Sequence, residues 1–323
     1  MMETRKELPK WLHDHIYNKM GSHYQPDRQA AQDNLLSTDD ENRRYLGTYF
    51  PRSFTESYCI FSNLFKNKAY LDQVRNKDSL NILSFGCGTG GDLIGLLESV
   101  ADNLPWIKNI DFTAFDGNFN AIGMLKGIVD QYIQLGRFNI RRRDYSPFPM
   151  NGRADFDLTC RCLTQGYDLI CSLKMVNELY RHNVITIAPF KTLLDSIAPK
   201  LSREGVMLCL DVPIRVKGEY MPALLSSGLR GFLAIHAEYE AIVPIPCHRY
   251  GRNCIGRCYP TQHFYGNIFG SEIVTYTIVA RSEMANAIIT NVPKAQYLIN
   301  KDNECCRCAK GQMNISIYDI NMI

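Results

Sequence analysis

A glycine-rich turn between an expected strand and an expected helix constrains this chain most. The segment Asn81 to Leu93 reads NILSFGCGTGGDL, an apolar run that leads into a turn with four glycines and then into a helical stretch. Glycine lets the backbone turn sharply and lets a ligand approach more closely than a Cβ would allow. The free N–H groups of a helix that starts near Asp92 would face that ligand. The segment therefore predicts a nucleotide-type cofactor site at the end of a buried parallel strand.

The glycines fit two cofactors. The set Gly86, Gly88 and Gly91 matches G-x-G-x-x-G, the turn of dinucleotide-binding folds. The set Gly86, Gly88 and Gly90 matches G-x-G-x-G, the turn with which class I methyltransferases hold S-adenosylmethionine. Cys87 lies inside the turn in both cases. We therefore expect Gly86, Cys87, Gly88 and Gly90 to contact the cofactor, and residues farther along the chain to identify it.

Two later strand ends carry acidic residues that bear on this choice. The second expected strand ends in Asp116-Gly117-Asn118, which places a carboxylate where the ribose hydroxyls of either cofactor would lie. The third ends in Asp144-Tyr145, and an acidic residue there resembles the methyltransferase residue that meets the adenine amino group. A lone Asp after a strand is more often a helix cap or a turn residue. Because all these signals occur in the right order, they favour S-adenosylmethionine.

Strands and helical stretches alternate through the middle of the chain, which predicts an α/β fold with an open parallel sheet and helices on both faces. Strands are expected at 81–86, 110–115, 138–143, 167–172, 205–211 and 273–281, and helices at 91–101, 119–135 and 187–200. We divide the chain into an N-terminal helical lid or extension (1–78), a Rossmann-like S-adenosylmethionine-binding core (79–212), a Cys/His-rich insertion before the last strand (213–270), and the last strand with a C-terminal tail (271–323).

The N-terminal extension contains an aromatic-rich amphipathic segment at 45–65, which we expect to be broken at Pro51. One role for this segment is to cover a face of the sheet. The other is to form a lid over cofactor and acceptor, which Tyr24, Tyr45 and Tyr49 would line.

Composition and charge indicate a soluble enzyme. The chain has 323 residues, of which 46% are hydrophobic, enough for a large core. No apolar run approaches the roughly 18 to 20 residues that span a bilayer, and the N-terminus has no apolar signal region. We therefore expect a cytoplasmic protein without membrane contact. A net charge of +3 does not argue for nucleic acid, and the dense arginines at 137 and 141–143 are either a solvated strand edge, which we favour, or a phosphate-binding patch.

A second unusual feature is a cluster of cysteines near residue 250. Cys247, Cys254 and Cys258 lie within twelve residues, with His248 and His263 beside them. A chain with 12 cysteines and no secretory signal should keep them reduced, so the clustering indicates a metal site rather than disulfides. Zinc and iron–sulfur clusters each normally need four ligands, so one more must come from a histidine or from the CCRC segment of the tail. Free thiols in an irregular loop are the alternative.

The fourth strand and the cysteine cluster together resemble a known family. The segment Tyr167 to Leu179, YDLICSLKMVNEL, is similar to the fourth strand and N-E-L turn of the mitochondrial small-ribosomal-subunit methyltransferase-like proteins and their bacterial relatives. Those proteins also place a Pro-Cys-His cluster before their last strand, as PIPCH and TYTIVAR are placed here. The resemblance covers roughly residues 45 to 281 and implies a class I methyltransferase fold.

The resemblance also implies a set of metal ligands. The chain departs from the family's pattern in its cysteine spacing, in LCLDVP where the family has Glu-Pro-Gly, and at residue 84. Carried over by motif, the ligands of an iron–sulfur site are Cys247, Cys254, Cys258 and, from the tail, Cys308, with Cys305 as the alternative. The family usually has an acidic residue two places before the first glycine of the turn, where it orients the loop or the methionine amine. This chain has Ser84 at that place.

In a methyltransferase the acceptor usually enters near the end of the fourth strand. Lys174, Asn177 and Glu178 follow that strand and are candidates to shape the pocket. As catalytic candidates, Asn177 could hydrogen-bond an acceptor, and Glu178 could accept a proton from its nitrogen or oxygen. Both residue types are more commonly capping or solvent-facing residues near the start of a helix.

Two classes of function remain open. The first is an enzyme that transfers a methyl group from S-adenosylmethionine to an RNA or a small molecule. The arginines and the resemblance favour RNA, whereas the low net charge favours a small acceptor. The second is a non-catalytic module that binds cofactor and metal and acts in ribosome assembly with a ribosomal partner. An NAD-dependent oxidoreductase is a weaker third option, because we find no convincing catalytic His or Tyr-Lys pair.

Overall fold

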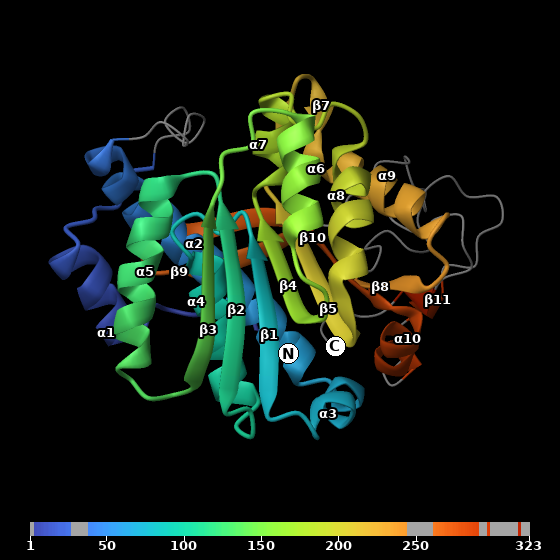
Figure 1. The fold of residues 1–323 in the computed structure, drawn as a ribbon, viewed down its shortest axis with the longest axis horizontal. Coiled ribbons are helices and arrows are strands. Elements are labelled where there is room, and N and C mark those ends of the chain that lie inside the picture. Colours follow the sequence, from blue (N-terminus) through green and yellow to red (C-terminus); the bar gives the residue numbers. More distant parts are fainter. Residues whose placement is uncertain (1–2, 27–37, 244–260, 291–295, 298–315, 318–323) are drawn as a thin grey trace.

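Eight strands form the main sheet of the computed structural model, which describes residues 3–26, 38–243, 261–290, 296–297 and 316–317 (Figure 1). These strands are β1 (Ser79–Phe85), β2 (Asn109–Asp116), β3 (Asn139–Pro147), β4 (Tyr167–Leu173), β5 (Leu201–Asp211), β8 (Tyr239–Val243), β9 (Gln262–Gly266) and β10 (Gly270–Arg281). Their order is β3-β2-β1-β4-β5-β10-β8, and β9 pairs with β10 off this path. The strands β1 to β5 pair in parallel with one another, whereas β10 is antiparallel to β5 and β8. The predicted Rossmann-like α/β sheet is therefore confirmed.

The central strand β1 lies between β2 and β4. Its apolar residues point to both faces of the sheet: Ile82 belongs to one hydrophobic core, and Leu83 and Phe85 belong to the other. A strand covered on both faces is apolar without alternation, as NILSF is. The chain passes from β1 to β2 on one side and later to β4 on the other, so the strand order reverses at β1. In open sheets of this kind, ligands bind at the carboxyl ends of the strands at such a point.

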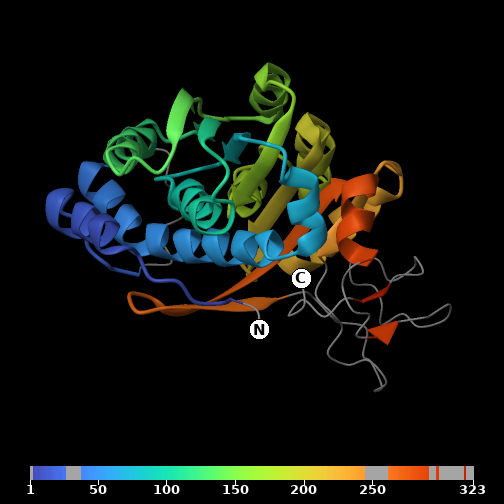
Figure 2. The same ribbon diagram turned by 90° about the horizontal axis from the view of Figure 1, so that it is seen from below.

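Helices cover both faces of the sheet. They are α1 (Lys10–His13), η1 (Asp14–Lys19), α2 (Asp39–Phe65), α3 (Lys68–Val74), α4 (Gly91–Asn103), α5 (Phe119–Ile133), α6 (Arg153–Cys162), α7 (Val176–Arg181), α8 (Pro189–Ile197), η4 (Ala198–Lys200), α9 (Met221–Leu233) and α10 (Ser282–Thr290). One core joins the sheet to α2, α4, α5 and α10, and the other joins it to α6, α7, α8 and α9. The long helix α2 packs along α4 (Figure 2). Of the described helices, none combines the length and the apolar character needed to cross a bilayer, α2 with its 27 residues included.

The helix α2 runs through Pro51 without interruption, so the predicted break at this residue is wrong. A proline inside a helix leaves the carbonyl four residues earlier without its N–H partner. Here that carbonyl belongs to Gly47, and the hydroxyl of Tyr17 donates a hydrogen bond to it at 2.6 Å. The donor comes from η1, a segment that the sequence does not show to lie beside α2. Tertiary contact therefore compensates for the local cost of the proline.

The described part of the predicted Cys-rich insertion contributes to the sheet. Between residues 213 and 243 the chain forms a short hairpin of β6 (Arg215–Val216) and β7 (Glu219–Tyr220), then α9, then β8. Strand β8 pairs with β10 at the edge of the main sheet. The cysteine cluster itself lies outside the described residues, so the boundaries of an insertion stay a prediction.

Candidate functional site

The glycine-rich turn joins the end of β1 to the start of α4. Gly86, Gly88 and Gly90 have φ angles of 82°, 51° and 88°, in the left-handed region that favours glycine. The N–H groups of Gly86 and Cys87 donate to the carbonyl of Phe115 at 2.8 and 2.9 Å. These hydrogen bonds tie the turn to the end of β2. The turn therefore needs its glycines and is fixed to the neighbouring strand.

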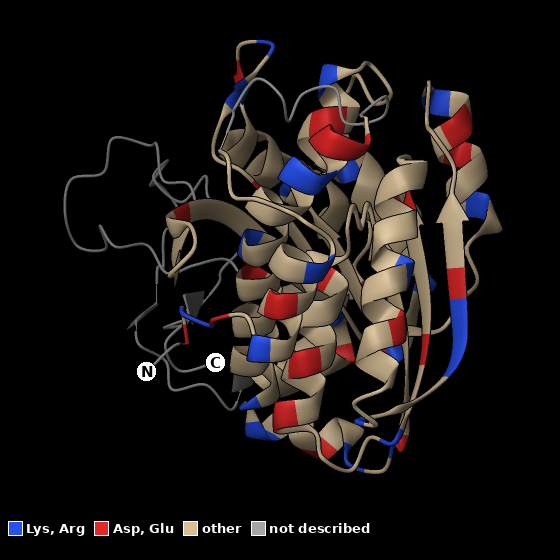
Figure 3. Ribbon diagram, turned by 90° about the vertical axis from the view of Figure 1, so that its left-hand side faces the viewer, with Lys and Arg blue, Asp and Glu red and all other residues tan. Residues whose placement is uncertain are grey.

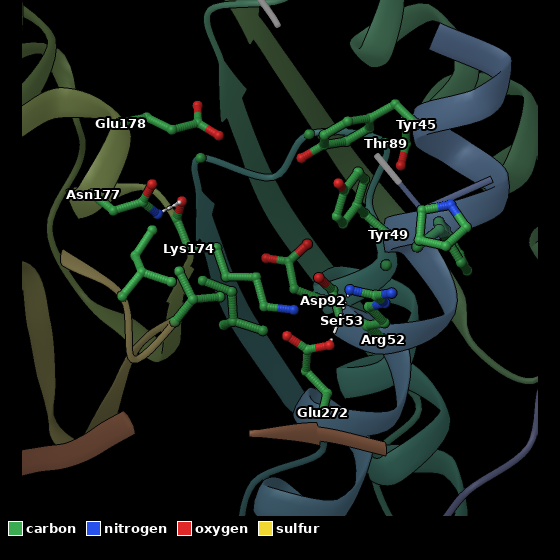
Figure 4. Close-up of a pocket in the computed structure, with 18 of the residues that line it drawn as sticks. Tyr45, Tyr49, Arg52, Ser53, Thr89, Asp92, Lys174, Asn177, Glu178 and Glu272 are labelled. Carbon is green, nitrogen blue, oxygen red and sulfur yellow. Dashed lines mark hydrogen bonds and ion pairs between the residues drawn. The ribbon is translucent and has the colours of Figure 1, made fainter. Parts of the chain in front are cut away.

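A first cavity of about 740 Å³ lies beside this turn (Figure 4). That volume is within the usual range of small-molecule binding sites. The turn, helix α2, the segments after β4 and β5, and the start of β10 all contribute to its lining. The polar residues that line it include Tyr45, Thr89, Asp92, Lys174, Asn177 and Glu178.

A second cavity of about 630 Å³ shares Gly86 and Glu178 with the first. Its lining is mostly apolar and comes from the ends of β2, β3 and β4. The residues concerned include Asp116, Gly117, Phe119, Met150, Asn151 and Met175. The two cavities adjoin at these shared residues, and charged side chains such as Asp92 and Lys174 line the first, whereas the second is mostly apolar.

Asp116 stands at the end of β2 and faces the second cavity. Its carboxylate accepts hydrogen bonds from the N–H of Gly88 at 2.6 Å and from the N–H of Asn118 at 2.8 Å. Burial raises the pKa of this carboxyl, and the backbone hydrogen bonds oppose the rise. Asp116 thus links the glycine turn to the second strand, and Gly117 beside it lines the same cavity.

Asn118 has a different position from its two neighbours. Its side chain accepts a hydrogen bond from the N–H of Ala121 at 3.0 Å and caps the start of α5. Its amide nitrogen donates to Oδ1 of Asn42 at 2.9 Å. Asn118 is buried and lines neither cavity, so its place in the structure is that of a helix cap.

Asp144 and Tyr145 lie before the end of β3 rather than at its tip. In the register of the sheet, Asp116 is opposite Pro147, and Asp144 is three residues earlier. The carboxylate of Asp144 pairs with Arg142 at 3.1 Å, and the ring of Tyr145 packs against Phe112. Neither residue lines the described cavities. At the end of β3 and just after it, the residues that line the second cavity are Pro147, Pro149, Met150 and Asn151, none of which the sequence singled out.

Asp92, in the first turn of α4, faces the first cavity (Figure 4) and is 2% exposed. Its Oδ2 accepts hydrogen bonds from Oγ of Ser84 at 2.5 Å and from Sγ of Cys171 at 3.3 Å. Its Oδ1 is buried and has no hydrogen-bond partner among the described residues. Burial raises the pKa of this carboxyl to about 6, against the lowering effect of hydrogen bonds from Ser84, Cys171 and the backbone N–H of Leu93.

Two ion pairs connect α2 with the rest of the cavity wall. Nζ of Lys174 lies 2.8 Å from Oε1 of Glu56, whose side chain is completely buried, and Arg52 pairs with Glu272 at 2.9 Å. Lys174 also has a φ of 61°, which is uncommon for a residue other than glycine. Strained backbone of this kind is concentrated at functional sites. Figure 4 shows the Lys174 side chain extending into the cavity.

Asn177 is held by the end of β5. Its Nδ2 donates to the carbonyl of Lys174 and to Oδ1 of Asp211, both at 2.7 Å, and its own N–H donates to Oδ2 of Asp211 at 2.9 Å. Both hydrogens of the amide are therefore used. Since Asn177 lines the first cavity, its Oδ1 is the atom available to a ligand, and that atom can only accept a hydrogen bond.

Glu178 lines both cavities. Burial, and then the nearby charges of Asp116 and Asp211, raise the pKa of its carboxyl to about 8. In Figure 4 this carboxyl points toward the hydroxyl of Tyr45, which lies on α2 and lines the first cavity as Tyr49 does. Tyr24, the third tyrosine named from the sequence, lines neither described cavity, and its hydroxyl accepts from Arg52 at 3.3 Å.

The predicted metal ligands Cys247, Cys254, Cys258 and Cys308 lie outside the described residues, as does His248. His263 is described and lies on β9, paired with Ile273 of β10. Within the ranges that the structure describes, no group of three or more His, Cys, Asp or Glu side chains could hold a metal ion. A zinc or iron–sulfur site therefore stays a prediction from the sequence.

No model of a known protein family matches this sequence, and no curated protein matches it either. Solved structures that share parts of the fold include the following three. The plantazolicin methyltransferase BpumL in complex with SAH is 14% identical, with a TM-score of 0.38 over 82% of this chain and 99% of that one. The SAH-bound Podospora anserina methyltransferase PaMTH1 is 15% identical, with a TM-score of 0.35 over 85% and 89%. The pyocyanin biosynthetic protein PhzM is 10% identical, with a TM-score of 0.39 over 76% and 60%. At this level of similarity none of them determines the family or the activity of this chain.

Proposed function

We propose that this chain is an S-adenosylmethionine-dependent methyltransferase that binds its cofactor across both cavities and its acceptor in the first. The observation that carries the proposal is that the two cavities meet at the glycine turn, at the carboxyl ends of β1, β2 and β4. Parallel sheets hold nucleoside ligands at this place. The cofactor has a flat adenosine part and a charged methionine part. The mostly apolar second cavity suits the first part, and the first cavity, which charged side chains line, suits the second part.

The second cavity fits the adenosine part. The carboxylate of Asp116 would accept hydrogen bonds from the ribose hydroxyls, and Gly117 leaves room for the sugar. Phe119 lines this cavity and is 72% exposed in the free protein, so an adenine ring stacked on it would remove apolar surface from water. Asn151 provides the amide that could read the polar edge of adenine, in place of the predicted Asp144.

The first cavity fits the methionine part and the acceptor. Gly88 and Thr89 line it next to the turn, and Asn177 and Glu178 line it at the end of β4. When bound, S-adenosylmethionine supplies a methyl group on a sulfonium, which transfers to a nucleophile in line with the S–CH3 bond. The contribution of this chain is to position the acceptor and to exclude water. Oδ1 of Asn177 would accept a hydrogen bond from the N–H or O–H of the acceptor.

Glu178 is the proposed proton acceptor. Its carboxyl must be ionised to take the proton that the acceptor loses. Because the pKa of this carboxyl is raised to about 8, it is mostly protonated at neutral pH in the free protein. A cationic ligand nearby would favour the ionised form. Methyl transfer is therefore expected to become faster as the pH rises from 7 to 9.

The described surface favours a small acceptor over RNA. Arg141 and Arg143 on β3 pair with Asp111 and Asp130, each at 2.6 Å. Arg142 of the same strand pairs with Asp144 at 3.1 Å. Figure 3 shows basic and acidic segments adjoining on the edge strand β3. These arginines are balanced by neighbouring acids, which supports the interpretation of a solvated strand edge. We keep RNA as the second possible acceptor, and a role in ribosome assembly as the alternative to catalysis.

The test is calorimetric titration of the purified chain with S-adenosylmethionine, S-adenosylhomocysteine and NAD. We expect micromolar binding of the first two and no binding of NAD. A Gly88→Arg variant should lose this binding, because Gly88 lines the first cavity and a Cβ there would already touch the ring of Tyr45. Gly123→Arg is the matched control, because Gly123 lies on α5 with open space around it. Absence of adenosyl-ligand binding, or equal binding by both variants, would contradict the proposal.

A further inference from the structure

The buried Oδ1 of Asp92 has no hydrogen-bond partner among the described residues, which points to a cationic ligand. A buried carboxylate costs free energy unless it is paired, and buried polar atoms in native proteins nearly always have a partner. Oδ1 of Asp92 is buried in the wall of the first cavity without such a partner among the described residues. The partner can therefore come from a ligand in that cavity.

The nearby basic side chains of the described residues do not supply this cation. Lys174 enters the same cavity, but its ammonium is bound to Glu56. Arg52 is bound to Glu272. Within the described ranges no Lys, Arg or His forms an ion pair with Asp92. Lys174 and Arg52 are thus held by other carboxylates. Arg181 and Arg215 also line the cavity, and within the described ranges neither forms an ion pair with Asp92.

We infer that Asp92 binds the ammonium group of the methionine part of the cofactor, which makes it a residue that positions and selects the cofactor. The inference rests on the proposed function. In the family that the chain resembles, an acidic residue stands two places before the first glycine of the turn, and this chain has Ser84 there. Asp92 provides the carboxylate from the first turn of α4 instead of from β1.

The contact between Ser84 and Asp92 explains why the two residues occur together. Oγ of Ser84 lies 2.5 Å from Oδ2 of Asp92, so both side chains reach the same place. Two carboxylates there would repel each other, and one of them would have to stay protonated. A serine at 84 is therefore compatible with an acid at 92, donates a hydrogen bond to it, and leaves Oδ1 for the ligand.

The charge state of Asp92 suits this role. Burial raises the pKa of its carboxyl to about 6, so the group is mostly ionised at neutral pH, and binding of an ammonium does not first require loss of a proton. Asp116, the acidic neighbour that also acts on this carboxyl, faces the second cavity and is fixed by backbone N–H groups.

The experiment compares two probes that differ in the methionine part. S-adenosylhomocysteine carries the ammonium, whereas 5′-methylthioadenosine has the same adenosine and sulfur but lacks the amino-acid end. Calorimetric titration of Asp92→Asn should show at least a tenfold loss of affinity for S-adenosylhomocysteine, because a hydrogen bond to a charged group is lost. The affinity for 5′-methylthioadenosine should stay within about twofold, as expected for a probe that makes no contact with residue 92. Asp130→Asn, a change on the exposed side of α5, is the matched control and should alter neither affinity.

The outcomes separate the inference from the proposed function. If the unchanged chain binds neither probe, the proposed function fails, and the inference fails with it. If the unchanged chain binds both but Asp92→Asn keeps full affinity for S-adenosylhomocysteine, only the inference is overturned. An equal loss for both probes also overturns it, because it would show that Asp92 supports the turn rather than the ammonium.

A double variant in which residues 84 and 92 exchange their side chains gives a second measurement that does not depend on a single substitution. Ser84→Asp combined with Asp92→Ser returns the carboxylate to β1 within the same contact. This double variant should recover at least half of the binding free energy that Asp92→Asn loses. Recovery supports a carboxylate that acts on the ligand, whereas affinity as low as in Asp92→Asn counts against it. Thermal unfolding of each variant shows whether the chain has kept its fold.

Discussion

The stability of this chain should depend on the protonation of Glu178. Its carboxyl lies where the two cavities meet and has its pKa raised to about 8 by burial and by the charges of Asp116 and Asp211. In the unfolded chain a glutamate titrates near its ordinary value. The folded chain therefore holds a proton that the unfolded chain has released, from about pH 5 to pH 8. Stability falls as the pH rises through this range, and the Glu178 contribution is lost above the folded-state pKa.

The size of the effect follows from the difference between the pKa of Glu178 in the folded chain, about 8, and its ordinary pKa in the unfolded chain, about 4.3. The folded chain holds nearly one extra proton over the two pH units from 6 to 8, and each unit corresponds to 1.36 kcal/mol. From pH 6 to pH 9 the loss is about 3 kcal/mol, and less where solvent in the cavity screens the carboxylate. A Glu178→Gln variant cannot ionise and lacks this loss.

Urea unfolding at pH 6, 7, 8 and 9, followed by circular dichroism, measures the effect. The free energy of unfolding of the unchanged chain should fall more steeply with pH than that of Glu178→Gln, and the gap between the two should change by about 1–3 kcal/mol. Glu283→Gln is the matched control, because Glu283 is exposed on α10 and pairs with Arg203 at the surface. Parallel pH profiles for the unchanged chain and Glu178→Gln would refute the reasoning, because they would mean that Glu178 is already ionised at neutral pH.

Four other substitutions test separate features of the structure. Tyr17→Phe removes the donor to the carbonyl that Pro51 leaves without a partner, and should lower the free energy of unfolding by about 1–2 kcal/mol in a urea titration; an unchanged value would mean that water replaces the tyrosine. Gly95→Ala places a Cβ against the backbone of α2 and should cost about 1–3 kcal/mol by the same assay; a more stable variant would show that α2 and α4 are farther apart than described. Asp116→Asn should weaken S-adenosylhomocysteine binding about tenfold or more in calorimetry, because a carboxylate accepts hydrogen bonds more strongly than an amide. Asp144→Asn should leave that affinity unchanged, since Asp144 faces neither cavity, and the opposite order of effects would restore the adenine contact expected from the sequence.

The sequence predicted the structure best at positions where the backbone conformation or the chemistry permits only a few residue types. Positive φ angles at the turn require glycine, so NILSFGCGTGGDL predicted both the strand end and the place of the cavities. The carboxylate at the end of β2 was predictable for a similar reason, because Asp116 directly follows a buried apolar run.

The end of β3 was harder to predict because this strand lies at the edge of the sheet. Most of its residues are polar and exposed, so no apolar pattern marks where it stops. An irregularity in its pairing with β2 leaves Arg141 without an opposite residue, and the strand continues to Pro147. The position of Asp144 relative to the cavity follows from this register. This register could not be predicted from the sequence alone.

Other features depend on contacts between distant segments. Pro51 reads locally as a helix break, and only the packing of η1 on α2 provides the hydroxyl of Tyr17 that satisfies the helix. Asp92 reads locally as a residue in the first turn of a helix, which favours acids. Its unpaired oxygen becomes visible only when α4 is placed beside β1 and β4, where Ser84 and Cys171 meet the carboxylate.

A crystal structure of this chain with S-adenosylhomocysteine tests the proposed cofactor site most directly. We expect the adenosine in the second cavity, with its ribose hydroxyls on Asp116, and the amino-acid end in the first cavity, beside the glycine turn. Density for the ligand in neither cavity, or an adenine ring placed at Lys174 instead of at Phe119, would contradict the proposed site.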